Sequence, residues 1–101
     1  MIQADDSSHE RAEEIGIRAL AHIAASPRLC ARYLELTGLT AQSLRRAAGE
    51  PGFLAGTLAF LTAHEPDLIA FADSAGLRPE EIAEAAHRLE AGRPPGSAGR
   101  R

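Results

Sequence analysis

The stretch that decides the fold runs from Phe53 to Ala63, reads FLAGTLAFLTA, and carries no charged side chain at any position. Pro51 before it and Pro66 after it are typical of the first positions of helices. A helix that is apolar on every side is normally buried on every side. We therefore expect a fourth helix, from Pro51 to Ala63, at the centre of a small helical bundle.

The same segment has a second interpretation, because one of its faces holds only small residues. Gly56, Ala59 and Ala63 share that face, and small residues let another helix come close to the backbone. These three residues are the candidate contact site for a partner chain. We prefer the central-helix interpretation and keep the contact face as the alternative.

Composition restricts the fold class to all-α. The chain of 101 residues is long enough for one compact domain and too short for two. It has no Val, Trp, Lys or Asn, and it is rich in Ala, Leu, Glu and Arg, which favour helices. A β-rich fold is therefore excluded.

Pro and Gly residues divide the rest of the chain into five further predicted helices. Gly38 and Gly76 each follow a helix and are expected to close it in the left-handed conformation. A Ser and a Glu three residues apart, Ser7 and Glu10, predict the start of the first helix. The other expected helices span residues 7–25, 27–37, 40–48, 66–75 and 79–91.

An internal repeat relates the two halves of the chain. Leu20–Ala25 aligns with Leu58–Ala63, and Gly38-Leu39 aligns with Gly76-Leu77. Two similar three-helix halves would each be too small to bury their apolar faces alone, so they should pack as one domain. We expect that domain to cover residues 1–92, with a flexible start to about residue 7, and residues 93–101 to form a disordered basic tail.

The charge distribution disfavours nucleic acid and membrane surfaces as partners of the domain. The formal charge is −3, but residues 1–92 hold eight Arg against all fourteen acidic residues, so the body carries −6. An acidic body repels phosphates and anionic lipids. Duplex DNA is thus not an expected partner. The longest apolar stretch is also too short to span a bilayer.

No arrangement of residues indicates catalysis, a cofactor, a metal or a small-molecule substrate. The single cysteine, Cys30, lies in an apolar run and is more typical of a core residue than of a nucleophile. His64 and Glu65 are followed at once by Pro66, so the zinc-protease helix pattern fails. The remaining histidines are His9, His22 and His87. One cysteine and no export signal favour the cytoplasm.

Two glycine-linked helix pairs have the spacing of a helix-turn-helix. After Gly76 the second helix presents acidic residues, which would meet phosphates with the wrong sign. After Gly38 it presents Arg45 and Arg46. A weak nucleic-acid binder that uses Arg45, Arg46 and the basic tail is therefore the alternative function.

A resemblance covers most of the chain, from about Ala12 to Leu89. The runs that carry it are Leu29–Leu39, Leu44–Ala48, Pro51–Ala55 and Ala75–Glu81. They resemble a family of small alphaproteobacterial proteins, the domain of unknown function 3572. The resemblance implies no catalytic or binding residue. The chain departs from the usual pattern at Cys30, and at Tyr33, where Phe is more usual.

The function expected from these observations is non-catalytic. A small, acidic, all-helical domain without a site for chemistry is most consistent with a protein–protein interaction or regulatory module. Its partner would be another protein or a second copy of the chain.

Overall fold

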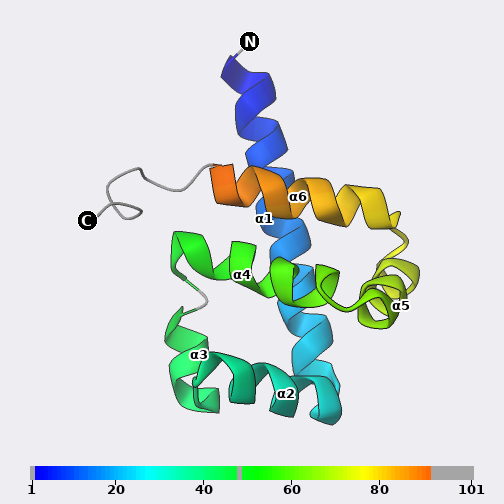
Figure 1. The fold of residues 1–101 in the computed structure, drawn as a ribbon. Coiled ribbons are helices and arrows are strands. Elements are labelled where there is room, and N and C mark those ends of the chain that lie inside the picture. Colours follow the sequence, from blue (N-terminus) through cyan, green and yellow to red (C-terminus); the bar gives the residue numbers. More distant parts are fainter. Residues whose placement is uncertain (1, 48, 92–101) are drawn as a thin grey trace.

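A computed structural model describes residues 2–47 and 49–91 of the chain (Figure 1). These residues form six α-helices and no strand, so the all-α prediction is confirmed. In chain order the helices are α1 (Ile2–Ala25), α2 (Pro27–Thr37), α3 (Ala41–Ala47), α4 (Pro51–Thr62), α5 (Glu65–Ala75) and α6 (Pro79–Ala91).

The first helix starts earlier than the sequence pattern indicates. We expected a flexible start and an N-cap at Ser7, but α1 already begins at Ile2 and continues through Ser7. The capping-box interpretation of Ser7 is therefore wrong. The expected tail, residues 93–101, lies outside the described residues.

Helix α1 acts as a common support for the others. Helices α6, α4 and α2 cross it one after another, and α4 packs closely along α6 (Figure 1). These three helices run in alternating directions, with α3 joining α2 to α4 at one end and α5 joining α4 to α6 at the other. The N-terminal part of α1 projects beyond α6.

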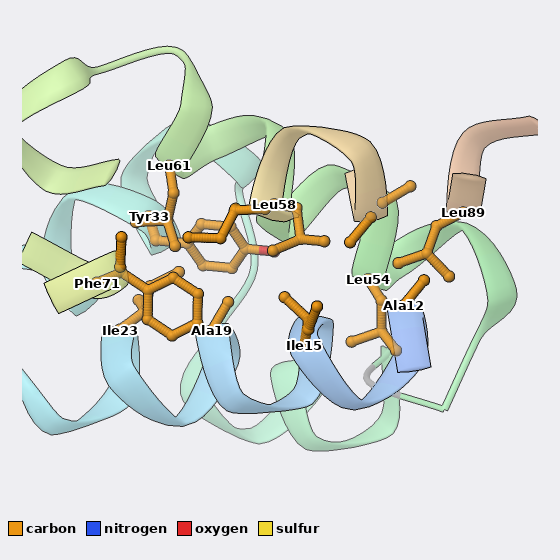
Figure 2. Packing of buried hydrophobic residues seen from close by; sticks show 14 of the residues in the cluster. Ala12, Ile15, Ala19, Ile23, Tyr33, Leu54, Leu58, Leu61, Phe71 and Leu89 are labelled. Carbon is orange, nitrogen blue, oxygen red and sulfur yellow. The ribbon is translucent and has the colours of Figure 1, made fainter. Parts of the chain in front are cut away.

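The core lies where α1 meets the crossing helices. Apolar side chains of α1 such as Ile15 and Ile23 point towards those of α4 and α5 (Figure 2). Phe71, Ile23, Leu58, Leu61 and Ile82 are the largest apolar side chains that are fully buried. Side chains of this size each contribute about 1.5–3 kcal/mol when they leave water. Burial at this junction therefore stabilises the bundle most.

The two predicted glycine caps are confirmed, and two side-chain caps accompany them. Gly38 and Gly76 have φ values of 76° and 72°, and they close α2 and α5 in the left-handed conformation. Ser26 accepts a hydrogen bond from the backbone N–H of Leu29, and Thr40 accepts one from that of Ser43. Local sequence therefore determines where these helices begin and end.

The two halves share a glycine C-cap, Gly38 on α2 and Gly76 on α5, but they differ in their packing. Helix α3 has seven residues and buries none of them, whereas α6 has thirteen and buries Ile82, Ala85 and Leu89. Helix α1 supports the whole bundle, while α4 is one of the helices that cross it. The internal repeat, and with it the superposition of the two halves helix for helix, stays a prediction.

Candidate protein-contact face

Helix α4 has one buried side and one exposed side. Leu58, Leu61 and Thr57 have 0% of their surface exposed, and Leu54 and Ala55 lie beside them in the core. Gly56, Ala59 and the C-cap residue Ala63 are exposed. We call the surface formed by Gly56, Ala59 and Ala63 the small-residue face. It is the face that the sequence singled out.

The expectation that α4 is buried on all sides is therefore wrong, although its central place is right. Helices α1, α5 and α6 pack against it and cover the side that holds the leucines. On the opposite side, Gly56, Ala59 and Ala63 stay exposed. Since that side has Gly and Ala in place of large apolar side chains, leaving it exposed costs little.

Gly56 has no role in the packing of the described chain. A Cβ built on Gly56 meets nothing within 4 Å, and its φ is not positive. At Gly16 the opposite holds, because a Cβ there would come 3.0 Å from Cβ of Leu54. Gly16 thus allows α1 and α4 to cross closely. An interior helical Gly costs about 1 kcal/mol relative to Ala, and nothing within the fold offsets that cost at Gly56.

Two aromatic residues border the small-residue face on the side of α2. Phe53 and Phe60 are half-buried, and their rings lie 6.1 Å and 5.0 Å from the ring of Tyr33 in edge-on geometry. Tyr33 itself is buried, with 2% of its surface exposed. The aromatic side chains therefore join α4 to α2, and the uncharged surface of α4 continues beneath α2.

A chain of hydrogen bonds holds the Tyr33 hydroxyl in this contact. The Thr57 hydroxyl donates to the carbonyl oxygen of Phe53 at 2.9 Å, which leaves its oxygen to accept from the Tyr33 hydroxyl at 3.1 Å. Burial raises the pKa of Tyr33, against the lowering effect of the bond to Thr57. The buried hydroxyl of Tyr33 is thus satisfied.

An ion-pair cluster, which the sequence analysis did not predict, lies beside these aromatics. Oδ2 of Asp67 accepts from Arg32 at 2.6 Å and from Nδ1 of His64 at 2.7 Å. The guanidinium carbon of Arg32 also lies 5.1 Å from the ring centre of Phe60. Asp67 is 6% exposed. The cluster ties α2 to the start of α5.

The charge state of Asp67 follows from its partners. Burial by itself would raise its pKa, but the hydrogen bonds and charges of Arg32 and His64 together lower it below the ordinary value. Asp67 therefore stays ionised. Its place three residues after the N-cap of α5 is visible in the sequence, but Arg32 is 35 residues away and only the fold brings it there.

The other residues that the sequence singled out lie apart from this region. His22 packs its ring on Phe71, His9 pairs with Glu13 on α1, and His87 is exposed on α6. Cys30 is half-buried and packs against the core, as predicted. Arg45 and Arg46 are exposed in the last turn of α3.

A shallow cleft of about 160 Å³ lies between α1 and α6. Ile15, Ala12 and Ala85 contribute its apolar part, and Arg11, Arg88, Glu81 and Glu84 its charges. Arg11 and Glu81 lie 3.6 Å apart and neutralise each other. Equal numbers of opposite charges leave this cleft without a preference for anions or cations.

Neither a metal-binding cluster nor a membrane-spanning helix occurs among the described residues. Within residues 2–47 and 49–91, no three His, Cys, Asp or Glu side chains come together as a metal ion would require. None of the helices there combines the length and apolar character needed to cross a membrane.

The fold and its contacts define a class: a small helical bundle with one uncharged, partly exposed helix. The chain belongs to the family described as "Protein of unknown function (DUF3572)", whose model matches residues 9–92. The resemblance noted from the sequence is thereby confirmed. No curated protein and no solved structure matches the chain.

Proposed function

We propose that the protein is a non-catalytic protein-interaction or regulatory module, and that its small-residue face binds a second copy of the chain. The two copies would pack α4 against α4 around a two-fold axis. Such symmetric interfaces use the same surface on both partners. The proposal also places the protein in a bacterial cytoplasm, where the single Cys30 stays reduced.

The observation that carries this proposal is the exposed Gly56 in the middle of α4. Glycine is favoured where another backbone must approach closely, and no part of the described chain approaches Gly56. Ala59 and Ala63 continue the face with the next smallest side chain. A second helix would find there a surface that its own backbone can reach.

Charge favours a second copy as the occupant. If two copies met through most parts of their acidic surface, like charges would come together. Helix α4 has no charged residue, so a contact through α4 avoids this. Two small-residue faces therefore meet without repulsion across the interface. Since each copy supplies the uncharged face that the other needs, the surface is complementary to itself.

Sedimentation equilibrium of the full chain tests the proposal over loading concentrations from about 5 to about 500 μM. We expect a reversible dimer. Gly56→Ala should weaken the dimer, because the added methyl group separates the two backbones. The same substitution should raise the melting temperature, because Ala favours the helix more than Gly does. Ala59→Glu should abolish the dimer. Ala83→Glu changes an exposed alanine of α6 and should leave it unchanged.

Different results identify different failures. A chain that stays monomeric over the whole range overturns self-association. A dimer that survives both Gly56→Ala and Ala59→Glu shows that another surface forms it.

Nucleic-acid binding is the second candidate. Arg45 and Arg46 are exposed, and no described residue forms an ion pair with either of them, so both guanidinium groups are available to phosphates. The acidic body opposes this function.

A further inference from the structure

We propose that α2 and α3 form a cover that detaches from the bundle as one unit, and that the Arg32–Asp67 ion pair is its latch. This inference does not depend on self-association, because it rests on how residues 27–47 are held. The open state would uncover Phe53, Thr57 and Phe60, which lie next to the small-residue face on α4.

The cover has little core of its own. Over Pro27–Ala47 only Leu29 and Tyr33 are buried, and α3 buries no residue. Leu36 is 70% exposed. Helix α4, by comparison, buries five side chains although it has only 12 residues. Segments with few buried apolar contacts open at a lower free energy than the core.

Helix α2 contacts α1 and α4 in different ways. It packs closely on α1, but between α2 and α4 the backbones approach each other little. Side chains bridge that distance: Tyr33 reaches Thr57 and the two phenylalanines, and Arg32 reaches Phe60 and Asp67. Two neighbouring residues of α2 therefore hold this side of the cover.

Opening of the cover would expose aromatic residues of α4. Viewed down the axis of α4, the side chains of Thr57, Phe53 and Phe60 are neighbours in that order, and Gly56 is next to Phe60. When Tyr33 leaves α4, the exposed uncharged surface of α4 includes the two aromatic rings in addition to the small residues. The cover thus controls how much of α4 a partner can reach.

Hydrogen exchange of single amides in the full chain tests the cover. A detached helix of eleven residues is too short to stay folded, so opening frees the amide of Tyr33 for exchange. Leu58, fully buried in α4, reports global unfolding. We expect Tyr33 to be less protected than Leu58.

Three variants separate the latch from general destabilisation. Arg32→Gln should speed exchange at Tyr33 about 5- to 10-fold. Arg28→Gln, an exposed arginine of the same helix, should change it less than about 2-fold. Ile82→Val weakens only the body of the bundle, so it should speed exchange at Leu58 and leave Tyr33 unchanged.

Two outcomes would overturn the inference. If Ile82→Val speeds amide exchange at Tyr33 and at Leu58 by the same factor, α2 opens only when the whole protein unfolds, and there is no separate cover. If Arg32→Gln acts no more strongly at Tyr33 than Arg28→Gln, the ion pair is not the latch.

Discussion

At the scale of single residues, the Tyr33–Thr57 pair shows how one buried hydroxyl depends on another. Tyr33 has one oxygen more than Phe, and that oxygen lies in a region that excludes water. The Thr57 oxygen accepts its hydrogen bond at 3.1 Å. Removing the acceptor should therefore cost more than removing the donor.

We expect Thr57→Val to lower the free energy of unfolding by about 1–3 kcal/mol, because it leaves the Tyr33 hydroxyl buried without an acceptor. Tyr33→Phe should cost about 1 kcal/mol, since Thr57 still donates to the carbonyl of Phe53. Thr62→Val, which also removes a hydroxyl from α4, should cost less. Urea denaturation measures all three, and a larger loss for Tyr33→Phe would contradict the assigned direction of the bond.

Gly38 and Gly76 are the other residues with a defined local role, because both have positive φ values. Replacing either by Ala should destabilise the protein by about 1 kcal/mol, since a Cβ is strained in the left-handed region. The space around both is open, so only the backbone conformation is at issue. Thermal denaturation checks this, and a neutral result at both positions would remove the capping explanation.

At the scale of helices, the crossing of α1 and α4 depends on a glycine that the sequence pattern does not distinguish from others. Gly16 and Gly56 both lie inside helices, yet only at Gly16 would an added methyl group meet a neighbour, Cβ of Leu54, at 3.0 Å. The same substitution should therefore have opposite effects at the two sites.

We expect Gly56→Ala to stabilise the protein by about 0.5–1 kcal/mol through helix propensity. Gly16→Ala should destabilise it, because Cβ of Leu54 is fixed to the backbone and the two helices must move apart. Melting temperatures measured at low concentration, where the chain is monomeric, compare them directly. Stabilisation by Gly16→Ala would show that α1 and α4 do not approach this closely.

At the scale of the whole molecule, the Asp67 cluster links stability to pH. The pKa of Asp67 is lower in the folded protein than its ordinary value of about 3.9. Its contribution to stability is therefore fully present above that ordinary value and is lost as pH falls through the lowered, folded-state pKa. Asp67→Asn should be less stable than the natural chain at neutral pH and should lose less stability on acidification. Urea titrations at a series of pH values measure both, and parallel curves would contradict this.

The net charge leads to a prediction for nucleic acid. Residues 1–92 should not bind duplex DNA measurably at about 150 mM salt, because their charge of −6 opposes approach and two arginines release few counterions. Fluorescence anisotropy with a random-sequence duplex is the measurement. Micromolar binding would instead support the alternative function, and Arg45→Ala with Arg46→Ala should then abolish it.

Local sequence by itself determined the helices and most of their ends. The residues that begin and end these helices act through contacts within a few residues. They are the prolines in first turns, Ser26 and Thr40 at helix starts, and Gly38 and Gly76 at helix ends. The exception is Ser7, where the helix continues because a serine is tolerated inside a helix as well as at its start. The uncharged face of α4 was visible for the same reason: helical spacing places Gly56, Ala59 and Ala63 together without further information.

Only the tertiary structure decided which side of α4 is buried and which residues meet across the bundle. Periodicity cannot orient a helix that is apolar on every side, so the neighbours α1, α5 and α6 had to select its core face. Asp67 and Arg32 are 35 residues apart, and Tyr33 and Thr57 are 24 apart. Such pairs depend on how the helices cross, and that is set by the packing of the whole core and not by any local pattern.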